Sequence, residues 1–222
     1  MNFKAPTLTT EFATHDVKRF VLRKPKGFKF VPGQGALLAI NKPGLRDEGH
    51  PFTPTSPPSD PVIEFTIKGY PRRRGLTGRL HKLAPGDELL IKAVFGDIRY
   101  KGPGVFIAAG TGITPFVGIL RQLRKAGKLA GNMLIFSNKT WADIILEREL
   151  RDALGGRCIF TLTREKRSGY ENRRIDARFL REKVRDFSRR FYVCGPAQFI
   201  AEVNAALLKL GAQRGKLVFD EP

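Results

Sequence analysis

The sequence changes its pattern near residue 103, and this change constrains the fold more than any other feature. Before it, short runs rich in Val, Ile, Phe and Thr are separated by Gly/Pro turns such as Pro32-Gly33 and Pro85-Gly86. Such spacing is typical of a small antiparallel barrel or sandwich. We expect strands at residues 8–14, 17–24, 36–40, 62–69 and 88–94, and one helix at residues 77–83 with Thr77 as its cap.

After residue 103 the pattern becomes an alternation of strands and helices. The strands are expected at residues 105–109, 132–136, 158–163, 191–194 and 217–219, and the helices at residues 114–126, 141–154, 176–185 and 196–210. This order is typical of a parallel sheet covered on both faces. The sequence therefore predicts two domains, an N-terminal antiparallel β-barrel at residues 1–102 and an α/β domain with a parallel sheet at residues 103–222.

The chain is strongly basic, with 40 Lys and Arg against 21 Asp and Glu and a net charge of +19. Such an excess favours an acidic partner, which could be nucleic acid, an anionic membrane surface, an acidic protein or a phosphorylated ligand. The basic residues are spread along the chain, without an aromatic-interleaved RNA-binding signature or a helix-turn-helix pattern. We therefore expect no nucleic acid as partner.

Neither the cysteines nor the hydropathy pattern indicates secretion or a membrane span. The two cysteines, Cys158 and Cys194, have no metal-ligand spacing, and the first residues lack a signal-peptide pattern. The 19 uncharged residues between Lys101 and Arg121 include five glycines and two prolines, which favours a strand, a turn and a helix over a membrane span. We expect a cytoplasmic protein with reduced thiols and no metal site.

Two strand-to-helix turns of the second half have the features of a ligand-binding edge. The first is Gly110-Thr111-Gly112-Ile113-Thr114-Pro115, and the second is Tyr192-Val193-Cys194-Gly195-Pro196. Glycines allow a ligand to approach the backbone, and a helix start offers free N–H groups to an anion. Thr114 is expected to cap its helix, with Pro115 at the first helical position, and Pro196 to begin the last helix. The alternative for the first turn is a tight connection without a ligand.

The first half contains a proline-rich segment, Gly49–Asp60, that reads GHPFTPTSPPSD. Its prolines fix the backbone on both sides of Phe52 and Thr53. A barrel with this aromatic-Thr pair, followed by GTGITP and then by a CGP strand end, resembles the ferredoxin–NADP reductase superfamily over essentially the whole chain. The resemblance implies a barrel that holds a flavin, usually FAD, and an α/β domain that binds NAD(P)H.

By this resemblance, His50, Pro51, Phe52 and Thr53 form the flavin motif, with Phe52 against the flavin ring and Thr53 near its N5 atom. His50 stands where the family has an arginine that holds the pyrophosphate, so FMN is an alternative to FAD. The triplet Arg72–Arg74 could replace the missing charge. Further flavin contacts are implied along the next strand and at the start of the predicted helix: Ile67, Lys68, Gly69, Tyr70, Gly75, Leu76 and Thr77.

The same resemblance assigns the nicotinamide nucleotide to the two turns. Its implied contacts are Gly110, Thr111, Gly112, Thr114, Pro115, Cys194, Gly195 and Pro196. The residues implied nearest the hydride path are Thr53, Cys194 and Glu221, with Cys194 as an orienting residue. Phe219 could cover the flavin, and Asp143 could contact the adenosine ribose or stabilise a helix start. NADH and NADPH stay open, with Lys139, Arg164 and Lys166 as candidates for a 2′-phosphate.

The resulting hypothesis is a flavin-dependent NAD(P)H reductase that passes electrons to a separate acceptor. Two cysteines cannot hold an iron–sulfur cluster that needs four, so the acceptor must be another molecule. An acidic ferredoxin or flavodoxin would suit the charge, and a free flavin or small quinone is the alternative. A flavin-binding electron-transfer subunit or redox sensor without turnover is the second hypothesis, favoured by His50.

Overall fold

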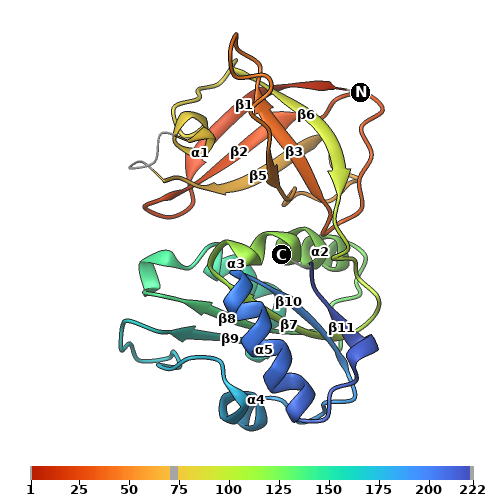
Figure 1. Cartoon of the computed structure of the whole chain (residues 1–222), viewed down its shortest axis with the longest axis vertical. Coiled ribbons are helices and arrows are strands. Elements are labelled where there is room, and N and C mark those ends of the chain that lie inside the picture. The colour runs from red at the N-terminus through yellow and green to blue at the C-terminus, as the bar shows by residue number, and fades with distance from the viewer. Residues whose placement is uncertain (1, 71–74, 221–222) are drawn as a thin grey trace. The chain divides into compact units, whose positions relative to one another are not determined.

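The structure, a computed structural model, describes residues 2–70 and 75–220. The chain divides into two compact units (Figure 1). Unit 1 comprises Met1–Gly96 and Thr114–Gln122, and unit 2 comprises Asp97–Ile113 and Leu123–Pro222. The domain boundary that the sequence predicts after residue 102 stays a prediction. Among the described residues, no helix has both the length and the apolar character needed to cross a bilayer.

Unit 1 is built around a six-stranded antiparallel sheet in the order β4-β3-β6-β1-β2-β5. An isolated bridge from Pro54 to Phe65 joins the chain after β4 to β5, so the two edge strands of the sheet are connected. Large apolar side chains such as Phe20 and Phe65 fill the interior with no exposed surface. The elements are β1 (Phe3–Phe12), β2 (Val17–Arg23), β3 (Gly35–Ile40), β4 (His50–Phe52), β5 (Val62–Lys68), α1 (Leu76–Leu80) and β6 (Glu88–Phe95).

Unit 2 is built around a five-stranded parallel sheet in the order β11-β10-β7-β8-β9. Its core includes Ile107, Phe191 and Val193, which are fully buried. The strands are β7 (Gly104–Ala109), β8 (Met133–Asn138), β9 (Cys158–Leu162), β10 (Arg190–Cys194) and β11 (Leu217–Val218). The helices of this half of the chain are η1 (Gly110–Ile113), α2 (Thr114–Lys125), η2 (Trp141–Asp143), α3 (Glu147–Leu154), η3 (Gly155–Arg157), α4 (Ala177–Lys183), α5 (Ala197–Lys209) and η4 (Arg214–Lys216).

The predicted fold class is confirmed, because an antiparallel and a parallel sheet follow each other along the chain. Three local predictions are wrong. Thr77 lies inside α1, whose N-cap is Gly75 without a side-chain cap. Thr114 is the first residue of α2 rather than its cap, because η1 runs directly into that helix. Pro196 is the N-cap of α5 and not its first helical residue.

The helix predicted at residues 141–154 is also wrong as a continuous element. The chain forms the short 3₁₀ helix η2, leaves the helical conformation, and resumes as α3. Thr140 and Asp143 form a capping box that ties the first turn to its own start, with Thr140 N 2.9 Å from Asp143 Oδ2. Leu146 then takes a left-handed conformation with φ 56° and caps α3. The apolar period alone gave no sign of this interruption.

Candidate functional site

The proline-rich segment begins with β4, a strand that the sequence did not predict. Its residues pair antiparallel with β3, Phe52 opposite Ala36 and His50 opposite Leu38. Pro51 is tolerated because β4 is at the edge of the sheet. A proline there lacks a backbone N–H group, but an edge strand has no second neighbouring strand in the sheet that would need this donor. His50 is exposed, whereas Phe52 is half-buried and packs against the barrel core.

The chain that follows Phe52 and Thr53 is held by β5. Thr55 N donates to Glu64 O at 2.7 Å, and Glu64 N donates to Ser56 Oγ at 3.0 Å. Gly118 of α2, which groups with unit 1, also lies close to this segment, since a Cβ atom there would come within 2.9 Å of Pro54 O. Phe52 and Thr53 therefore lie between a paired strand and an anchored loop, and their backbone has little freedom.

The side chain of Glu64 makes a buried ionic network next to this loop. Glu64 is 3% exposed. Its carboxylate accepts hydrogen bonds from Arg19 Nε at 2.5 Å and from Arg121 Nη1 at 2.5 Å. Thr55 Oγ1 donates a third bond at 2.7 Å, and Arg121 Nη1 also donates to Thr55 O at 3.1 Å. The sequence gave no indication of this network.

Burial by itself raises the pKa of the Glu64 carboxyl group, because a charge is costly in an apolar interior. The positive charge of Arg121, the hydrogen bond from Thr55 and the charge of Arg19 outweigh this effect and hold the pKa below its ordinary value. Glu64 is therefore ionised at neutral pH, and both arginines have a buried counter-charge.

The end of β5 is shaped by His81, a residue that the sequence did not connect with this region. His81 Nε2 lies 2.8 Å from Ile67 O, and a Cβ atom on Gly69 would come within 2.6 Å of the His81 ring. The side chains of Ile67 and Leu76 are 1% exposed and belong to the barrel core. Only the backbone of these two residues could therefore contact a ligand.

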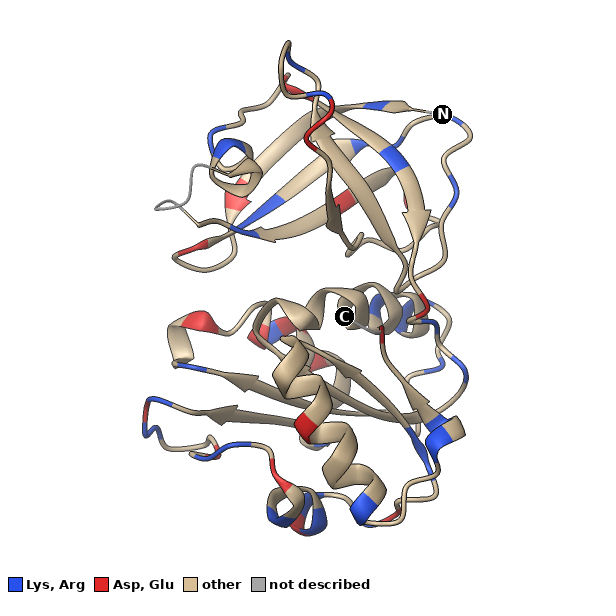
Figure 2. Ribbon diagram, viewed as in Figure 1, with Lys and Arg blue, Asp and Glu red and all other residues tan. Residues whose placement is uncertain are grey.

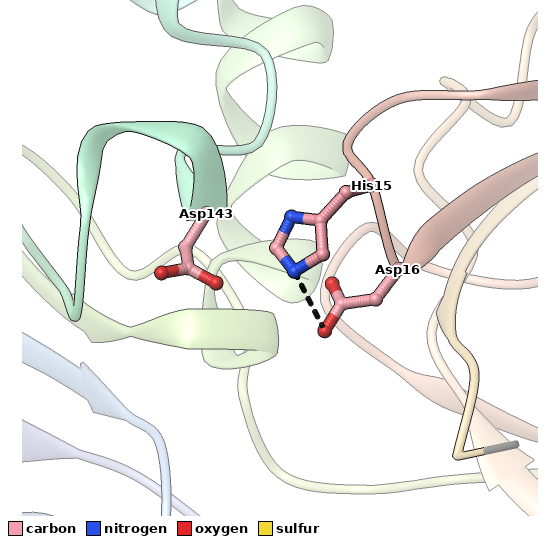
Figure 3. Close-up of side chains that lie close together, drawn as sticks. All are labelled: His15, Asp16 and Asp143. Atoms are coloured by element: carbon pink, nitrogen blue, oxygen red, sulfur yellow. Dashed lines mark ion pairs between the residues drawn. The ribbon is translucent and has the colours of Figure 1, made fainter.

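Charged side chains surround the turn between β1 and β2. Lys68 Nζ is 2.6 Å from Asp16 Oδ2, and His15 Nε2 is 3.6 Å from the same atom (Figure 3). Gly69 N donates to Asp16 O at 2.8 Å, so this turn also supports the end of β5. Lys68 is thus partly neutralised by Asp16, while Tyr70 is 42% exposed beyond it. The triplet Arg72–Arg74 lies outside the described residues.

In unit 2 the two glycine-containing turns come together at the carboxyl ends of β7 and β10. These strands pair in parallel, with Ala108 opposite Cys194. A Cβ atom on Gly112 would come within 2.4 Å of Cys194 O and 2.6 Å of Gly195 N. Gly110 has φ 54°, a left-handed conformation that a residue with a side chain rarely adopts. The two turns therefore form one tightly fitted glycine surface.

The thiol of Cys194 is unsuited to nucleophilic chemistry. Burial and the charge of Asp220 raise its pKa to about 12, although the backbone N–H of Gly195 acts in the opposite direction. A thiol with this pKa stays protonated at neutral pH. Gly195 packs closely as well, because a Cβ atom there would come within 2.7 Å of the Phe199 ring. Glu221 lies outside the described residues, and Phe219 is half-buried beside the core of unit 2.

The loops after β8 and β9 lie side by side at the same edge, since Arg164 N donates to Lys139 O at 2.8 Å. Asn138, at the end of β8, is 4% exposed, and neither polar atom of its side chain has a hydrogen-bond partner within the described protein. Such a buried amide calls for a partner that the protein chain itself does not supply. Asp143 serves in the capping box with Thr140, which accounts for its position.

A hydrogen-bonded and stacked cluster on these loops was missed by the sequence. Trp141 is 44% exposed, its Nε1 donates to Glu147 Oε2 at 2.9 Å, and the Arg167 guanidinium lies 4.1 Å from its ring centroid. Trp141 N donates to Glu165 Oε2 at 2.7 Å. The available signal in the sequence was the tryptophan itself, two residues after Lys139.

Comparison with known proteins agrees with this geometry. Residues 106–205 match the family model described as the oxidoreductase NAD-binding domain. NADH-cytochrome b5 reductase 2 of Mycosarcoma maydis is 28% identical over 224 residues, which cover 90% of this chain and 63% of that protein. The structure of a ferredoxin NADP+ reductase from Neisseria gonorrhoeae superposes with a TM-score of 0.86 at 19% identity, covering 99% of this chain and 98% of the other.

The family match and these similarities support the ferredoxin–NADP reductase superfamily for this chain. Within it, the flavohaem-like FAD/NAD-binding domain of nitric oxide dioxygenase from Vibrio cholerae has the same fold, with a TM-score of 0.88, 21% identity, and coverage of 99% of this chain and 98% of that one. The present chain spans less than two thirds of the length of the Mycosarcoma maydis reductase.

The structure brings the predicted residues into two groups. His50–Phe52 and the end of β5 lie in unit 1, where Pro54 bridges to Phe65. Gly110–Ile113 and Cys194 lie in unit 2, where Gly112 contacts the Cys194 carbonyl. The roles of the individual residues toward a flavin or a nucleotide stay predictions.

Proposed function

We propose that this chain is a flavin-dependent oxidoreductase that takes a hydride from NAD(P)H and passes electrons to a separate acceptor. The observation that carries the proposal is the fit between Gly112 and the Cys194 carbonyl, where a Cβ atom would come within 2.4 Å. Ligands of open α/β sheets bind at the carboxyl ends of the strands, next to such turns. The Mycosarcoma maydis relative is named as an NADH-dependent reductase, which supports the same activity.

The nucleotide would lie along the glycine surface of unit 2. At Gly110, Thr111 and Gly112, the nucleotide would approach the protein backbone closely. The residues that would border the nicotinamide are Thr114, Pro115, Gly195 and Pro196. The protonated thiol of Cys194 would orient that ring without reacting. The unpartnered amide of Asn138 supports a ligand at this edge, because binding would satisfy buried polar atoms.

The flavin, FAD with FMN as the alternative, would be held by unit 1. When bound, it supplies the chemistry of accepting a hydride and releasing electrons. Phe52 would lie against its ring and Thr53 would donate or accept a hydrogen bond at the ring edge, both on a backbone anchored through Thr55 and Ser56. This rigid backbone supports the assignment of the flavin to unit 1, because hydride transfer depends on the alignment of donor and acceptor.

The remaining flavin contacts follow from the same arrangement. Lys68, Gly69 and Tyr70 would border the ribityl chain, and the backbone of Ile67, Gly75, Leu76 and Thr77 would contribute N–H or carbonyl groups. His50 is exposed and offers no guanidinium to a pyrophosphate. We therefore propose weaker binding of FAD than an arginine would provide.

The electron acceptor would be a separate carrier. A ferredoxin, a flavodoxin or a cytochrome b5-like protein suits a chain of net charge +19, since opposite charges accelerate encounter. Either nicotinamide nucleotide is compatible with the loops after β8 and β9, where Lys139, Arg164 and Lys166 are exposed. Turnover with NADH and with NADPH would distinguish the two.

One experiment tests the proposal directly. The purified protein is reconstituted with FAD and with FMN, its visible spectrum is recorded, and NADH or NADPH is added without oxygen. Rapid bleaching of the flavin absorbance is expected. A protein that takes up neither flavin would overturn the proposal. Uptake without bleaching by either nucleotide would favour the second candidate, a flavin-binding subunit or sensor, which the exposed His50 supports.

A further inference from the structure

The positive charges of unit 2 are unevenly distributed between the two edges of its sheet. Five segments lead into the five strands, at residues 101–103, 124–132, 155–157, 185–190 and 213–216. We call this set of segments the amino edge. It contains one carboxylate, Asp186, and ten basic residues: Lys101, Arg124, Lys125, Lys128, Arg157, Arg185, Arg189, Arg190, Arg214 and Lys216.

The opposite edge is balanced. The segments that follow the strands, at residues 110–113, 139–149, 163–171, 195–196 and 219–220, carry five basic and six acidic residues. The basic residues are Lys139, Arg148, Arg164, Lys166 and Arg167, and the acidic ones are Asp143, Glu147, Glu149, Glu165, Glu171 and Asp220. Figure 2 shows red and blue mixed in the loops after β8 and β9 and blue along the loops that lead into β10 and β11. The excess charge is therefore a property of one edge.

The five segments form one continuous surface. Hydrogen bonds connect basic side chains of one segment to the backbone of the next: Arg157 Nη1 to Leu129 O at 3.0 Å, Arg189 Nη2 to Gly131 O, and Lys216 Nζ to Ser188 O at 2.6 Å. Arg190 pairs with Gly104, which joins the segment before β7 to the segment before β10. The ten charges therefore belong to one side of the unit.

Most of these side chains are open to solvent. Seven of the ten are exposed and three are half-buried. Arg157, Arg189 and Lys216 bond to carbonyl groups, which orient a cation without neutralising it, and the carboxylate near Arg189 and Lys216 is that of Asp186. By contrast, Arg178 of α4 and Arg173, which precedes that helix, share the carboxylate of Glu182, at 3.1 Å and 2.5 Å.

Helix dipoles account for part of this charge only. Arg124 and Lys125 lie in the last turn of α2, and Arg185 follows α4, where a cation is favoured. Of the other seven, Arg157, Arg214 and Lys216 lie in the three-residue 3₁₀ helices η3 and η4. Lys101, Lys128, Arg189 and Arg190 lie in loops or at a strand start, where the net dipole is small. Crowding like charges there opposes folding. A structural role thus leaves most of the amino edge unexplained.

The composition of this edge favours a phosphate-bearing surface as its partner. In the described residues, the exposed large apolar side chains are Leu8, Phe12, Val31, Tyr70, Phe95 and Trp141, and all lie outside the amino edge. Protein interfaces need an apolar or aromatic centre, and single-stranded nucleic acid needs aromatic platforms. Arginine and lysine without exposed aromatic side chains match the headgroups of anionic lipids.

We propose that the amino edge of unit 2 is a docking surface for a leaflet of anionic phospholipid. Five neighbouring strands about 4.8 Å apart spread the charges over about 20 Å, which suits a flat surface better than a groove. The glycine turns are at the other ends of the same strands. Strands of five or six residues are about 17–20 Å long, so the glycine turns lie about that far from the amino edge. Unit 2 docked in this way keeps its carboxyl edge open to a nucleotide. The proposal is independent of the oxidoreductase activity.

The test is co-sedimentation of the full chain with vesicles of phosphatidylglycerol and phosphatidylcholine, against vesicles of phosphatidylcholine alone. Binding is expected only to the anionic vesicles, and it should weaken steeply as salt is added, because exposed charges are screened. Equal binding to both kinds of vesicle would overturn the proposal. A duplex or single-stranded oligonucleotide that displaces the anionic vesicles at equal phosphate concentration would also overturn it, in favour of nucleic acid.

Two variants with the same change in net charge locate the surface. The edge variant carries Lys101→Gln, Lys128→Gln, Arg185→Gln and Arg214→Gln, and the control carries Lys4→Gln, Arg23→Gln, Lys26→Gln and Lys29→Gln in unit 1. All eight side chains are exposed, so both variants should fold. The edge variant should lose vesicle affinity by about a hundredfold or more at low salt, at about fivefold per charge. Similar losses in both variants would show non-specific attraction and overturn the assignment.

Discussion

The carboxylate of Glu64 accepts a hydrogen bond from Arg121 Nη1 at 2.5 Å while Thr55 Oγ1 donates to the same oxygen atom at 2.7 Å. This contact connects β5, helix α2 and the loop after Phe52 and Thr53 within unit 1. Removing one member of a buried ion pair leaves an uncompensated charge, which is more costly than losing an exposed pair. Glu64 is therefore the residue from which the stability of this region is best tested.

Glu64→Ala should destabilise unit 1 strongly. We expect a loss of about 3–5 kcal/mol in the free energy of unfolding, because two arginines lose their buried counter-charge. Urea denaturation followed by circular dichroism measures it. The matched control is Glu11→Ala, which removes the exposed partner of Arg19 and should cost about 1 kcal/mol or less. Equal losses in the two variants would contradict a buried network.

The same carboxylate predicts a pH dependence of stability. The folded-state pKa of Glu64 is below its ordinary value of 4.5, so folding favours the ionised form. Its contribution is fully present above about pH 4.5 and declines as the pH falls through the lowered folded pKa. The difference in unfolding free energy between wild type and Glu64→Gln should therefore shrink between neutral pH and the acidic limit. A difference that is constant over this range would exclude Glu64 as the source.

Gly112→Ala should impair the nucleotide edge. The new Cβ atom would meet the Cys194 carbonyl at 2.4 Å, so one of the two turns must move. We expect at least about a tenfold rise in the dissociation constant for NADH or NADPH, together with a stability loss of about 1–3 kcal/mol. Calorimetric titration and thermal unfolding measure the two effects. Gly156→Ala is the control, because no atom lies within 4 Å of its Cβ position.

Cys194 should be inert toward alkylating reagents. Because burial and Asp220 raise the pKa of its thiol to about 12, the fraction of thiolate near pH 7 is negligible. Cys158 has a pKa raised to about 12 as well, chiefly by burial. Mass spectrometry after treatment with iodoacetamide at pH 7 should find both thiols unmodified in the folded protein and modified in urea. Rapid labelling of the folded protein would contradict the buried, protonated thiol.

His50→Arg should strengthen flavin binding if the proposed site is correct. An arginine on the exposed β4 edge would add a charge-assisted hydrogen bond to a pyrophosphate, and we expect about a tenfold lower dissociation constant for FAD. FMN lacks the pyrophosphate, so its affinity should change less. Flavin fluorescence quenching measures both. His15→Arg, on the turn beside Asp16, is the control for added charge and should leave the FAD affinity unchanged.

Much of the fold could be predicted because it depends on local patterns. The change near residue 103 from Gly/Pro-separated β runs to alternating strands and helices follows from residue propensities and the spacing of turns. Strand β4 was missed because Pro51 argues against a strand, and only pairing with β3 at a sheet edge makes it tolerable. The break at Leu146 was missed because a capping box overrides the apolar period of residues 141–154.

The candidate site divides in the same way. The sequence by itself determined the two glycine-containing turns and the stiff segment around Phe52 and Thr53, because glycine and proline act on the backbone where they occur. Only the tertiary structure decided that Gly112 meets the Cys194 carbonyl, that His81 contacts Ile67 and that ten charges share one edge. Glu64 bonds to arginines 45 residues before it and 57 after it. Contacts at such separations depend on how strands pair and helices pack, which no local pattern encodes.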